Sequence, residues 1–242
     1  MNVDSEFTVA DQRIMAEAKN YFLWQYNLVE PFLGKRVLEI GCGIGNFTTF
    51  LKDSNCRVLG VDIDGECIES HRRRFADRDH IQQCLLDAMS PEIERIRGFE
   101  PDTIICLNVL EHIQDDRNAL AHMFNIMRPG GKVCLIVPAY EALRGPIDNA
   151  LGHYRRYTLG KVRRVSLSVG FVIRNLHYMN VVGFFGWWLN ARVFKRTNQS
   201  PFQVRAFDRF VVPSLLRMER MVPPPFGQNI FAVLEKPGQV TN

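Results

Sequence analysis

The chain has 242 residues, 46% of them hydrophobic, which suits one α/β domain with an elaboration. It contains no apolar run of 18 residues and begins with the acidic, polar stretch MNVDSEFTVADQ, so we expect a cytoplasmic protein without a transmembrane helix or a secretion signal. The formal charge of +4 is uneven: residues 139–242 carry 15 Lys or Arg against 5 Asp or Glu, a net of +10, and the remainder carries −6. A basic half indicates either an anionic partner or solvated helix faces.

The first predicted element is an amphipathic helix. Residues 11–33 have apolar side chains at helical spacing, and Pro31 and Gly34 end the pattern. The aromatic residues on this helix include Tyr21 and Tyr26. Packing in the core and contact with a ligand both remain open for these two rings.

A glycine-rich turn follows the first predicted strand, residues 36–40. The segment VLEIGCGIGNFT begins with an apolar run typical of a buried parallel strand and continues with Gly41, Gly43 and Gly45. Glycine lets the backbone turn tightly or approach a ligand closely. Residues 46–52 are predicted to form a helix, so the glycines lie at the carboxyl edge of the sheet, where open α/β sheets bind ligands.

Two acidic residues flank this turn. Glu39 precedes it within a buried strand, and Asp62 ends the next predicted strand, residues 56–62. The carboxylate of Glu39, directly before the glycine turn, is unfavourable for a pyrophosphate and suits a cationic ligand. Asp62 follows Gly41 by about the 20 residues expected of a carboxylate that holds a ribose diol. A dinucleotide site would need G-x-G-x-x-G, but position 46 is Asn.

The remaining pattern predicts a doubly wound sheet. Further strands are expected at 80–86, 103–108, 132–137, 171–178 and 229–234, and helices at 67–75, 115–127 and 159–168. The six cysteines form no C-x-x-C pair and fall mostly on predicted strands, so they read as small buried residues. We find no metal-ligand spacing and expect no metal site.

Five motifs occur in the order and at the intervals of a known family. They are the glycine turn, the acidic strand end, Leu86-Asp87-Ala88, DTIICLN followed by VLEH at residues 102–112, and MRPGG at residues 127–131. With them the chain resembles the class I S-adenosylmethionine-dependent methyltransferases, in particular their type 11/12-like small-molecule branch. The resemblance implies a Rossmann-like seven-stranded sheet, mostly parallel with an antiparallel last strand, helices on both faces, and here a helical insert before that strand.

The resemblance also implies S-adenosyl-L-methionine as methyl donor, S-adenosyl-L-homocysteine as product, and a set of cofactor-binding residues. That set is Glu39, Gly41, Cys42, Gly43, Gly45, Asn46, Asp62, Ile63, Asp87, Ala88, Asn108, Val109 and His112. Asp87 would contact the adenine, or else be a solvated loop carboxylate. His112 would contact the cofactor, or else cap or pack the following helix.

The acceptor is expected near the loop of residues 140–157. Its run GHYRRYT resembles a segment of quinone-pathway O-methyltransferases. His153 is the candidate general base because its ordinary pKa is near neutral, with Tyr154 beside it, although a structural hydrogen bond would also explain the histidine. Tyr140, Arg155 and Tyr157 are the candidate substrate contacts. Successive arginines need not face the same way, so we do not expect Arg155 and Arg156 both to take part.

We predict a single domain over residues 1–242. Residues 1–35 would cover the cofactor, 36–138 form the cofactor-binding core, 139–178 the acceptor-pocket region, 179–228 an aromatic and basic helical insert, and 229–235 the last strand. Within the insert, residues 181–196 combine a run of Phe and Trp with Arg and Lys. This segment is a candidate for peripheral membrane contact, a buried helix, a subunit contact or a lid over an apolar acceptor.

The expected function is methyl transfer by in-line displacement to a small amphiphilic or lipid-like acceptor, with oxygen favoured as the methylated atom. The fourth strand lacks the Asn/Asp-Pro-Pro-Tyr/Phe run and the Pro-Cys pair used on nucleobases, so nucleic acid is not the expected partner. An RNA-binding methyltransferase and a non-catalytic, cofactor-binding partner subunit are the alternatives. A homodimer is also open.

Overall fold

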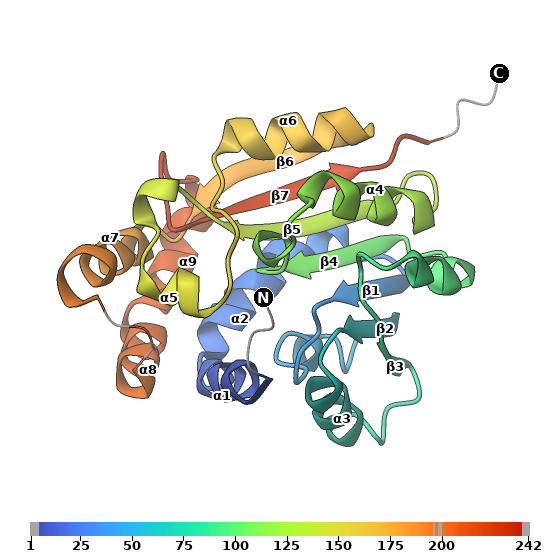
Figure 1. Ribbon diagram of the computed structural model, residues 1–242, viewed down its shortest axis with the longest axis horizontal. Coiled ribbons are helices and arrows are strands. Elements are labelled where there is room, and N and C mark those ends of the chain that lie inside the picture. Colours follow the sequence, from blue (N-terminus) through green and yellow to red (C-terminus); the bar gives the residue numbers. More distant parts are fainter. Residues whose placement is uncertain (1–4, 196, 198–199, 239–242) are drawn as a thin grey trace.

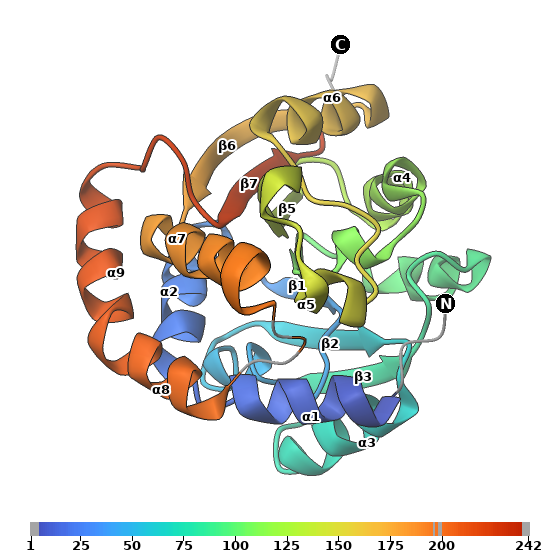
Figure 2. The same ribbon diagram turned by 60° about the vertical axis from the view of Figure 1, so that its left-hand side comes forward.

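The computed structural model describes residues 5–195, 197 and 200–238, and its arrangement is shown in Figures 1 and 2. Within these residues a seven-stranded sheet has the order β3-β2-β1-β4-β5-β7-β6. The strands are β1 (Arg36–Ile40), β2 (Arg57–Asp62), β3 (Ile81–Leu85), β4 (Thr103–Leu107), β5 (Lys132–Pro138), β6 (Val172–Met179) and β7 (Asn229–Glu235). β1 to β5 pair in parallel, whereas β7 is antiparallel to both β5 and β6. The predicted fold class is therefore confirmed.

Helices and 3₁₀ segments precede the first strand and connect the later ones. They are α1 (Ser5–Met15), α2 (Lys19–Val29), η1 (Glu30–Phe32), η2 (Thr48–Phe50), α3 (Gly65–Arg74), η3 (Pro91–Phe99), η4 (Leu110–His112), α4 (Asp116–Ile126), η5 (Glu141–Leu143), α5 (Pro146–Ala150) and α6 (Leu159–Val169). The insert between β6 and β7 adds α7 (Val181–Leu189), the π-helix η6 (Asn190–Phe194), α8 (Pro201–Phe210) and α9 (Val212–Met221). None of the helices within the described residues combines the length and the hydropathy needed to cross a bilayer.

The central strands β1, β4, β5 and β7 are apolar and buried on both faces, as strands between two helical layers require, whereas the edge strands β3 and β6 are partly exposed. On one face, side chains such as Leu38 and Ile104 pack with α4, α6 and η3, and on the other, side chains such as Val37 and Ile105 pack with α2 and α9. Figure 1 shows α4 and α6 together on one side of the sheet, with α2 and α9 on the other. The core thus leaves the carboxyl edge of the sheet free for a site.

Two predicted helices differ from the observed ones. Residues 46–52 form only the short turn η2, because Thr48 and Thr49 are β-branched and their hydroxyls bond to Glu39 and to the carbonyl of Gly45. Residues 11–33 form two helices, α1 and α2, rather than one. The carboxylate of Asp208 in α8 accepts hydrogen bonds from the backbone of Asn20 and Tyr21, and so caps the start of α2 from 188 residues away.

The predicted insert is confirmed as a helical excursion between the two strands of an antiparallel hairpin. Asn180, which has a positive φ of 65°, caps α7 through its side chain, and the carboxylate of Glu219 in α9 accepts from the backbone of Asn180 and Val181. The start of α7 is therefore held by a residue from α9. In Figure 2, α7 lies in front of the sheet edge, beside α5, with α8 and α9 along the flank.

Candidate functional site

A cleft of about 2010 Å³ opens at the carboxyl ends of the parallel strands. It includes the point between β1 and β4 where the strand order reverses, which is where open α/β sheets bind ligands. Its walls come from the loops after β1, β2, β4 and β5 and from α1, α7 and α8. Pockets for one small molecule commonly measure about 300–1,000 Å³, so the cleft has room for a cofactor and an acceptor together.

The glycine turn forms the floor of one half. Gly41 has a φ of +72°, and a side chain there would overlap Val109. The Gly41 and Cys42 amides donate to the carbonyl of Val61, which fixes the turn against β2. Of the predicted residues within the turn itself, Gly41, Cys42 and Asn46 line the cleft.

Gly43 and Gly45 lie behind this floor, outside the cleft lining. Gly43 is covered by Gln12 of α1, whose side-chain oxygen accepts from the Ile44 amide at 2.8 Å. Gly45 faces Phe75, and a Cβ at either position would overlap its neighbour. The second and third glycines thus provide room for α1 and α3 to pack, and the cofactor contact expected of them stays a prediction.

Asp62 ends β2 at the edge of the cleft. Its carboxylate accepts from the backbone N–H groups of Gly43 at 2.8 Å and Asp64 at 3.0 Å, and so ties the turn to the strand end. Burial raises the pKa of Asp62, while those two N–H groups partly offset the shift. Each carboxylate oxygen can accept more than one hydrogen bond, so Asp62 retains capacity for a ribose diol. The exposed Ile63 lies beside it.

Glu39 is a buried carboxyl on the cleft wall. The Thr48 hydroxyl donates to it at 2.6 Å, and Nε2 of His71 lies 3.0 Å from that hydroxyl. Burial raises the pKa of Glu39 to about 8, more than the Thr48 hydrogen bond lowers it. The carboxyl therefore holds its proton at neutral pH unless a cation approaches it.

The other predicted cofactor residues also line the cleft. Asp87 and Ala88 follow β3, and Asn108, Val109 and His112 follow β4. The Asp87 carboxylate accepts from the Met89 amide at 2.8 Å. Asn108 has a backbone φ of +55°, which is unusual for a residue other than glycine. Such backbone conformations are frequent at functional sites. The five residues therefore line the same cleft, from the ends of two strands that β1 and β2 separate.

The other half of the cleft is organised by a buried ion-pair network around Asp148 of α5. Its carboxylate accepts from His153 Nδ1 at 2.8 Å and from Arg156 Nε at 2.8 Å. Trp187 of α7 adds an Nε1–H contact to Asp148 at 3.4 Å and carries the Arg156 guanidinium over its ring at 5.0 Å. Burial acts to raise the pKa of Asp148, but His153 and Arg156 together hold it well below its usual range.

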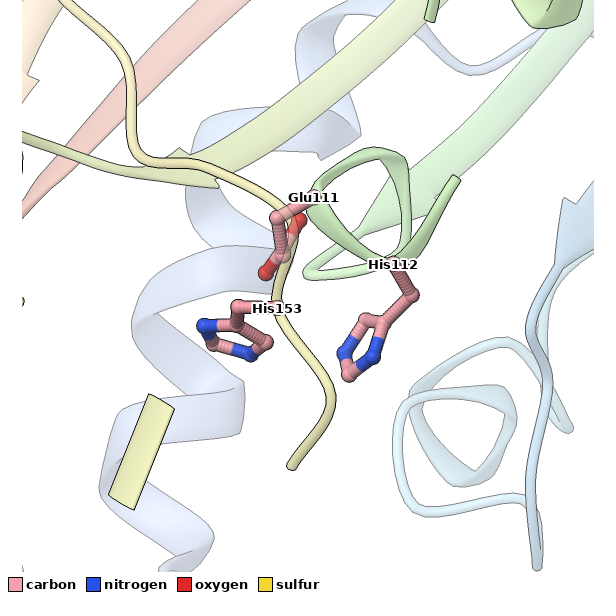
Figure 3. A group of neighbouring side chains, drawn as sticks. All are labelled: Glu111, His112 and His153. Atoms are coloured by element: carbon pink, nitrogen blue, oxygen red, sulfur yellow. The ribbon is translucent and has the colours of Figure 1, made fainter. Parts of the chain in front are cut away.

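Beside this network, Glu111, His112 and His153 point toward one another (Figure 3). The two imidazole rings are 4.6 Å apart and nearly perpendicular. Burial raises the pKa of Glu111 to about 7 and lowers that of His112 to about 4. The predicted catalytic residues His153 and Tyr154 both line the cleft.

The three predicted substrate contacts lie outside the cleft lining, which corrects their assignment. Residues 154–156 have no regular secondary structure and Tyr157 forms an isolated bridge with Ala139, and the contacts of successive side chains here lie on opposite sides. Tyr154 and Arg156 therefore face the cleft, while Arg155 and Tyr157 turn away to Asp116, at 3.2 and 3.0 Å. Tyr140 stacks on Tyr178 instead, with ring centroids 4.9 Å apart.

Several residues of this half escaped sequence reasoning. They are Glu111, Arg144, Asp148, Arg156 and Trp187. The sequence offered one signal for Asp148: it stands three residues after Gly145, with Pro146 between them, a pattern typical of a capped helix start. The alternation of residues 154–157 could have favoured Arg156 over Arg155. No local signal placed Trp187 beside them.

Comparisons with known proteins agree with this geometry. A family model described as a methyltransferase domain matches residues 11–178. A protein named S-adenosyl-L-methionine-dependent Diels-Alderase iccD, from Talaromyces variabilis, is 33% identical over 106 residues, which are 43% of this chain and 36% of that protein. A ubiquinone biosynthesis O-methyltransferase from Erwinia tasmaniensis is 26% identical over 114 residues, 46% of this chain and 45% of that protein. The chain therefore matches less than half the length of these relatives.

Among solved structures, phosphoethanolamine N-methyltransferase 2 of Haemonchus contortus, in complex with S-adenosyl-L-methionine, superposes with a TM-score of 0.62 at 17% identity. The match covers 94% of this chain and 57% of that one. At this identity the likeness shows a shared fold.

Proposed function

Because the chain belongs to the class I S-adenosyl-L-methionine-dependent methyltransferase family, with S-adenosyl-L-methionine as its cofactor, we propose that it transfers the methyl group to an oxygen of a small amphiphilic acceptor. The observation that carries the proposal is the two-part cleft. One half has the glycine turn, Glu39 and Asp62, and the other has His153, Arg156 and Trp187. The cofactor and the acceptor would meet near His112, between the two halves.

Methyl transfer makes modest demands on the protein. The acceptor oxygen attacks the methyl carbon in line with the carbon–sulfur bond, which breaks and leaves its electron pair on sulfur as S-adenosyl-L-homocysteine forms. Because the sulfonium already activates the methyl group, the protein mainly holds the two reactants in line and excludes water. The α5 and α7 segments over the cleft suit that role.

The proton of an acceptor hydroxyl would pass to His153. Its Nδ1 lies against the carboxylate of Asp148, an obligate acceptor, so the neutral ring carries its proton on Nδ1 and offers a lone pair at Nε2. Arg144, which lines the cleft and is partly exposed, favours an acceptor with an anionic group. The O-methyltransferase name of the Erwinia relative supports oxygen as the methylated atom.

The direct test is a screen of hydroxylated amphiphiles for S-adenosyl-L-homocysteine release. Turnover with at least one hydroxyl compound is expected. If the cofactor binds but no acceptor of any class turns over, a non-catalytic partner subunit becomes the better description. RNA-dependent release that falls steeply with added salt would favour the RNA-binding alternative. Cyclisation of a polyene without S-adenosyl-L-homocysteine release would favour the activity named in the Talaromyces relative.

We expect cofactor binding to release a proton from Glu39. The pKa of Glu39 is about 8 in the free protein, and a sulfonium beside it would favour the carboxylate. The affinity for S-adenosyl-L-methionine should therefore rise with pH, by up to about tenfold per unit below pH 8, and then level off. Calorimetry from pH 6 to 9 in buffers of different ionisation enthalpy measures both effects.

S-adenosyl-L-homocysteine is the matched control, because it has the same amino acid and nucleoside but no charge on sulfur. Its affinity should follow only the ionisation of that amino acid, and the Glu39→Gln variant should treat both ligands alike. Identical pH profiles for the two ligands in the unmodified protein would contradict this role of Glu39.

An apolar face on the insert supports a lipid-like acceptor. α7 turns Trp187 toward the cleft but leaves other aromatic side chains exposed. The exposed apolar side chains of the insert are Val182, Phe185, Trp188, Leu189, Val193, Phe194, Phe202 and Phe210, and of these Leu189, Phe194, Phe202 and Phe210 also line the cleft. Residues 181–207 contain no Asp or Glu, and Arg192 and Lys195 stand within the same stretch. Aromatic side chains with flanking cations favour an anionic lipid surface.

The protein is therefore expected to float with vesicles that contain anionic lipid, and less with zwitterionic ones. Phe185→Glu combined with Trp188→Glu should abolish flotation, while Leu167→Glu, which changes a similarly exposed side chain on α6, should not. Flotation unaffected by the double change would rule this face out. A dimer that dissociates on the same change would assign the face to a second copy of the chain instead.

A further inference from the structure

Glu111 is a buried carboxylate without a partner. Its side chain is 1% exposed, and among the residues that the structure describes neither Oε1 nor Oε2 has a hydrogen-bond partner. The neighbouring guanidinium of Arg156 donates to Asp148 and to the carbonyl of Ala139. In its ionised form an unpaired buried carboxyl costs several kcal/mol, so Glu111 on the cleft wall is available to bind a cation.

The two histidines beside Glu111 are oriented as ligands. His153 donates from Nδ1 to the Asp148 carboxylate, which leaves the lone pair of Nε2 free. The His112 ring is hydrogen-bonded to the backbone of Leu151, which by the same logic leaves its other nitrogen as an acceptor. Metal-binding histidines are held in this way, by a carboxylate or a carbonyl behind the ring.

One donor atom from each of Glu111, His112 and His153 lies within 4.8 Å of the other two, and Figure 3 shows the three side chains converging from η4 and from the loop after α5. We propose that these residues bind one divalent transition-metal ion. Two imidazoles and one carboxylate form a ligand set that binds zinc or iron(II) and leaves a position open for water or an acceptor oxygen.

The required adjustment is small. Zinc lies about 2.0–2.2 Å from nitrogen and oxygen ligands, so two ligands of a tetrahedral ion are about 3.3–3.6 Å apart. The three donor atoms lie within 4.8 Å of one another. They reach the tetrahedral separation if each moves by about an ångström or less, which side-chain rotation can provide. All three residues line the cleft, so the open position would face the acceptor half.

The ion would supply what an oxygen acceptor needs, and in this step the inference rests on the proposed function. A hydroxyl bound to a divalent cation has a lowered pKa. Its O–H bond would break with the proton passing to water in the cleft, and the oxygen would then take the methyl group. His153 Nε2 would serve as a ligand instead of the base, because one lone pair cannot do both.

The test measures metal binding separately from activity. Full-length protein stripped with a chelator is titrated with Co²⁺ and with Zn²⁺, followed by the visible absorption of cobalt and by metal content after dialysis. One ion per chain is expected, with a raised thermal midpoint in its presence. Glu111→Gln keeps the side-chain shape and should weaken metal binding by about 100-fold or more, as should His112→Ala.

His122→Ala is the matched control, because His122 lies on α4 outside the cleft lining, and it should bind metal normally. The cobalt spectrum shows whether a cysteine binds the metal instead, since thiolate ligation produces an intense near-ultraviolet band. Absence of cobalt binding, binding with that band, or binding unchanged in Glu111→Gln would each overturn the site.

Activity separates this inference from the proposed function. If the metal-free protein still transfers methyl groups and binds no metal in the titration, the proposed function stands and the metal site is excluded. Stoichiometric binding that Glu111→Gln abolishes supports the site even if no acceptor turns over. The affinity for S-adenosyl-L-methionine, measured in the same samples, should be unchanged in Glu111→Gln.

Discussion

Replacing His153 with alanine is expected to lower methyl-transfer turnover by about 10²–10⁴-fold, the usual contribution of a positioned proton acceptor. The affinity for S-adenosyl-L-methionine should stay within about twofold, because the ring lies in the half of the cleft built by α5 and α7. Single-turnover kinetics and calorimetry measure the two quantities independently. His122→Ala, which changes a histidine on α4, should behave as the unmodified protein.

Turnover that survives His153→Ala would remove both proposed roles of Nε2, proton acceptor and metal ligand. The same loss is expected from either role, and the cobalt titration distinguishes them. Loss of cofactor affinity in this variant would instead mean that the ring supports the fold of the cleft. Thermal unfolding provides that check, since Asp148 would keep its bonds to Arg156 and to the Gly145 amide.

Replacing Asp62 with alanine is expected to weaken cofactor binding by about 100-fold or more. Two hydrogen bonds from a ribose diol to a charged acceptor would be lost, each of about 1.5–3 kcal/mol. The N–H groups of Gly43 and Asp64 would also lose their acceptor, and the glycine turn would loosen. Calorimetry with S-adenosyl-L-methionine and S-adenosyl-L-homocysteine should give the same loss for both ligands.

Asp62→Asn provides a graded comparison, because the amide keeps one acceptor oxygen, and an intermediate loss is expected. Glu69→Ala controls for removal of a carboxylate from the same region, since Glu69 pairs only with Arg72 and Arg73 on the exposed side of α3 among the residues described. Unchanged affinity in Asp62→Ala would exclude the ribose role.

The strands, the glycine turn and the acidic strand end that line one half of the cleft could be predicted from sequence because their determinants are local. Buried strands appear as apolar runs, and a turn at Gly41 needs a residue that accepts a positive φ. Asp62 stands at its strand end whatever packs around it. Even here the surroundings of Gly43 and Gly45 depend on α1 and α3, which cover them. The local sequence pattern does not predict that contact.

The acceptor half depended on which distant segments meet. Arg155 and Arg156 are adjacent and chemically identical. They differ in the direction of their side chains, so that Arg155 pairs with Asp116 and Arg156 with Asp148. Glu111 and His153 are far apart in the chain, yet their side chains lie next to each other (Figure 3), with donor atoms within 4.8 Å.

The sequence by itself determined the succession of strands and helices along the chain, the glycine turn, the acidic strand ends and the presence of an insert. Burial patterns and backbone conformations of this kind are set by neighbouring residues. Only the tertiary structure decided which side chains share the acceptor pocket, where α2 begins under the Asp208 cap, and which face of α7 remains exposed. Those features depend on contacts between residues far apart in the chain, which form only when the helical layers close on the sheet.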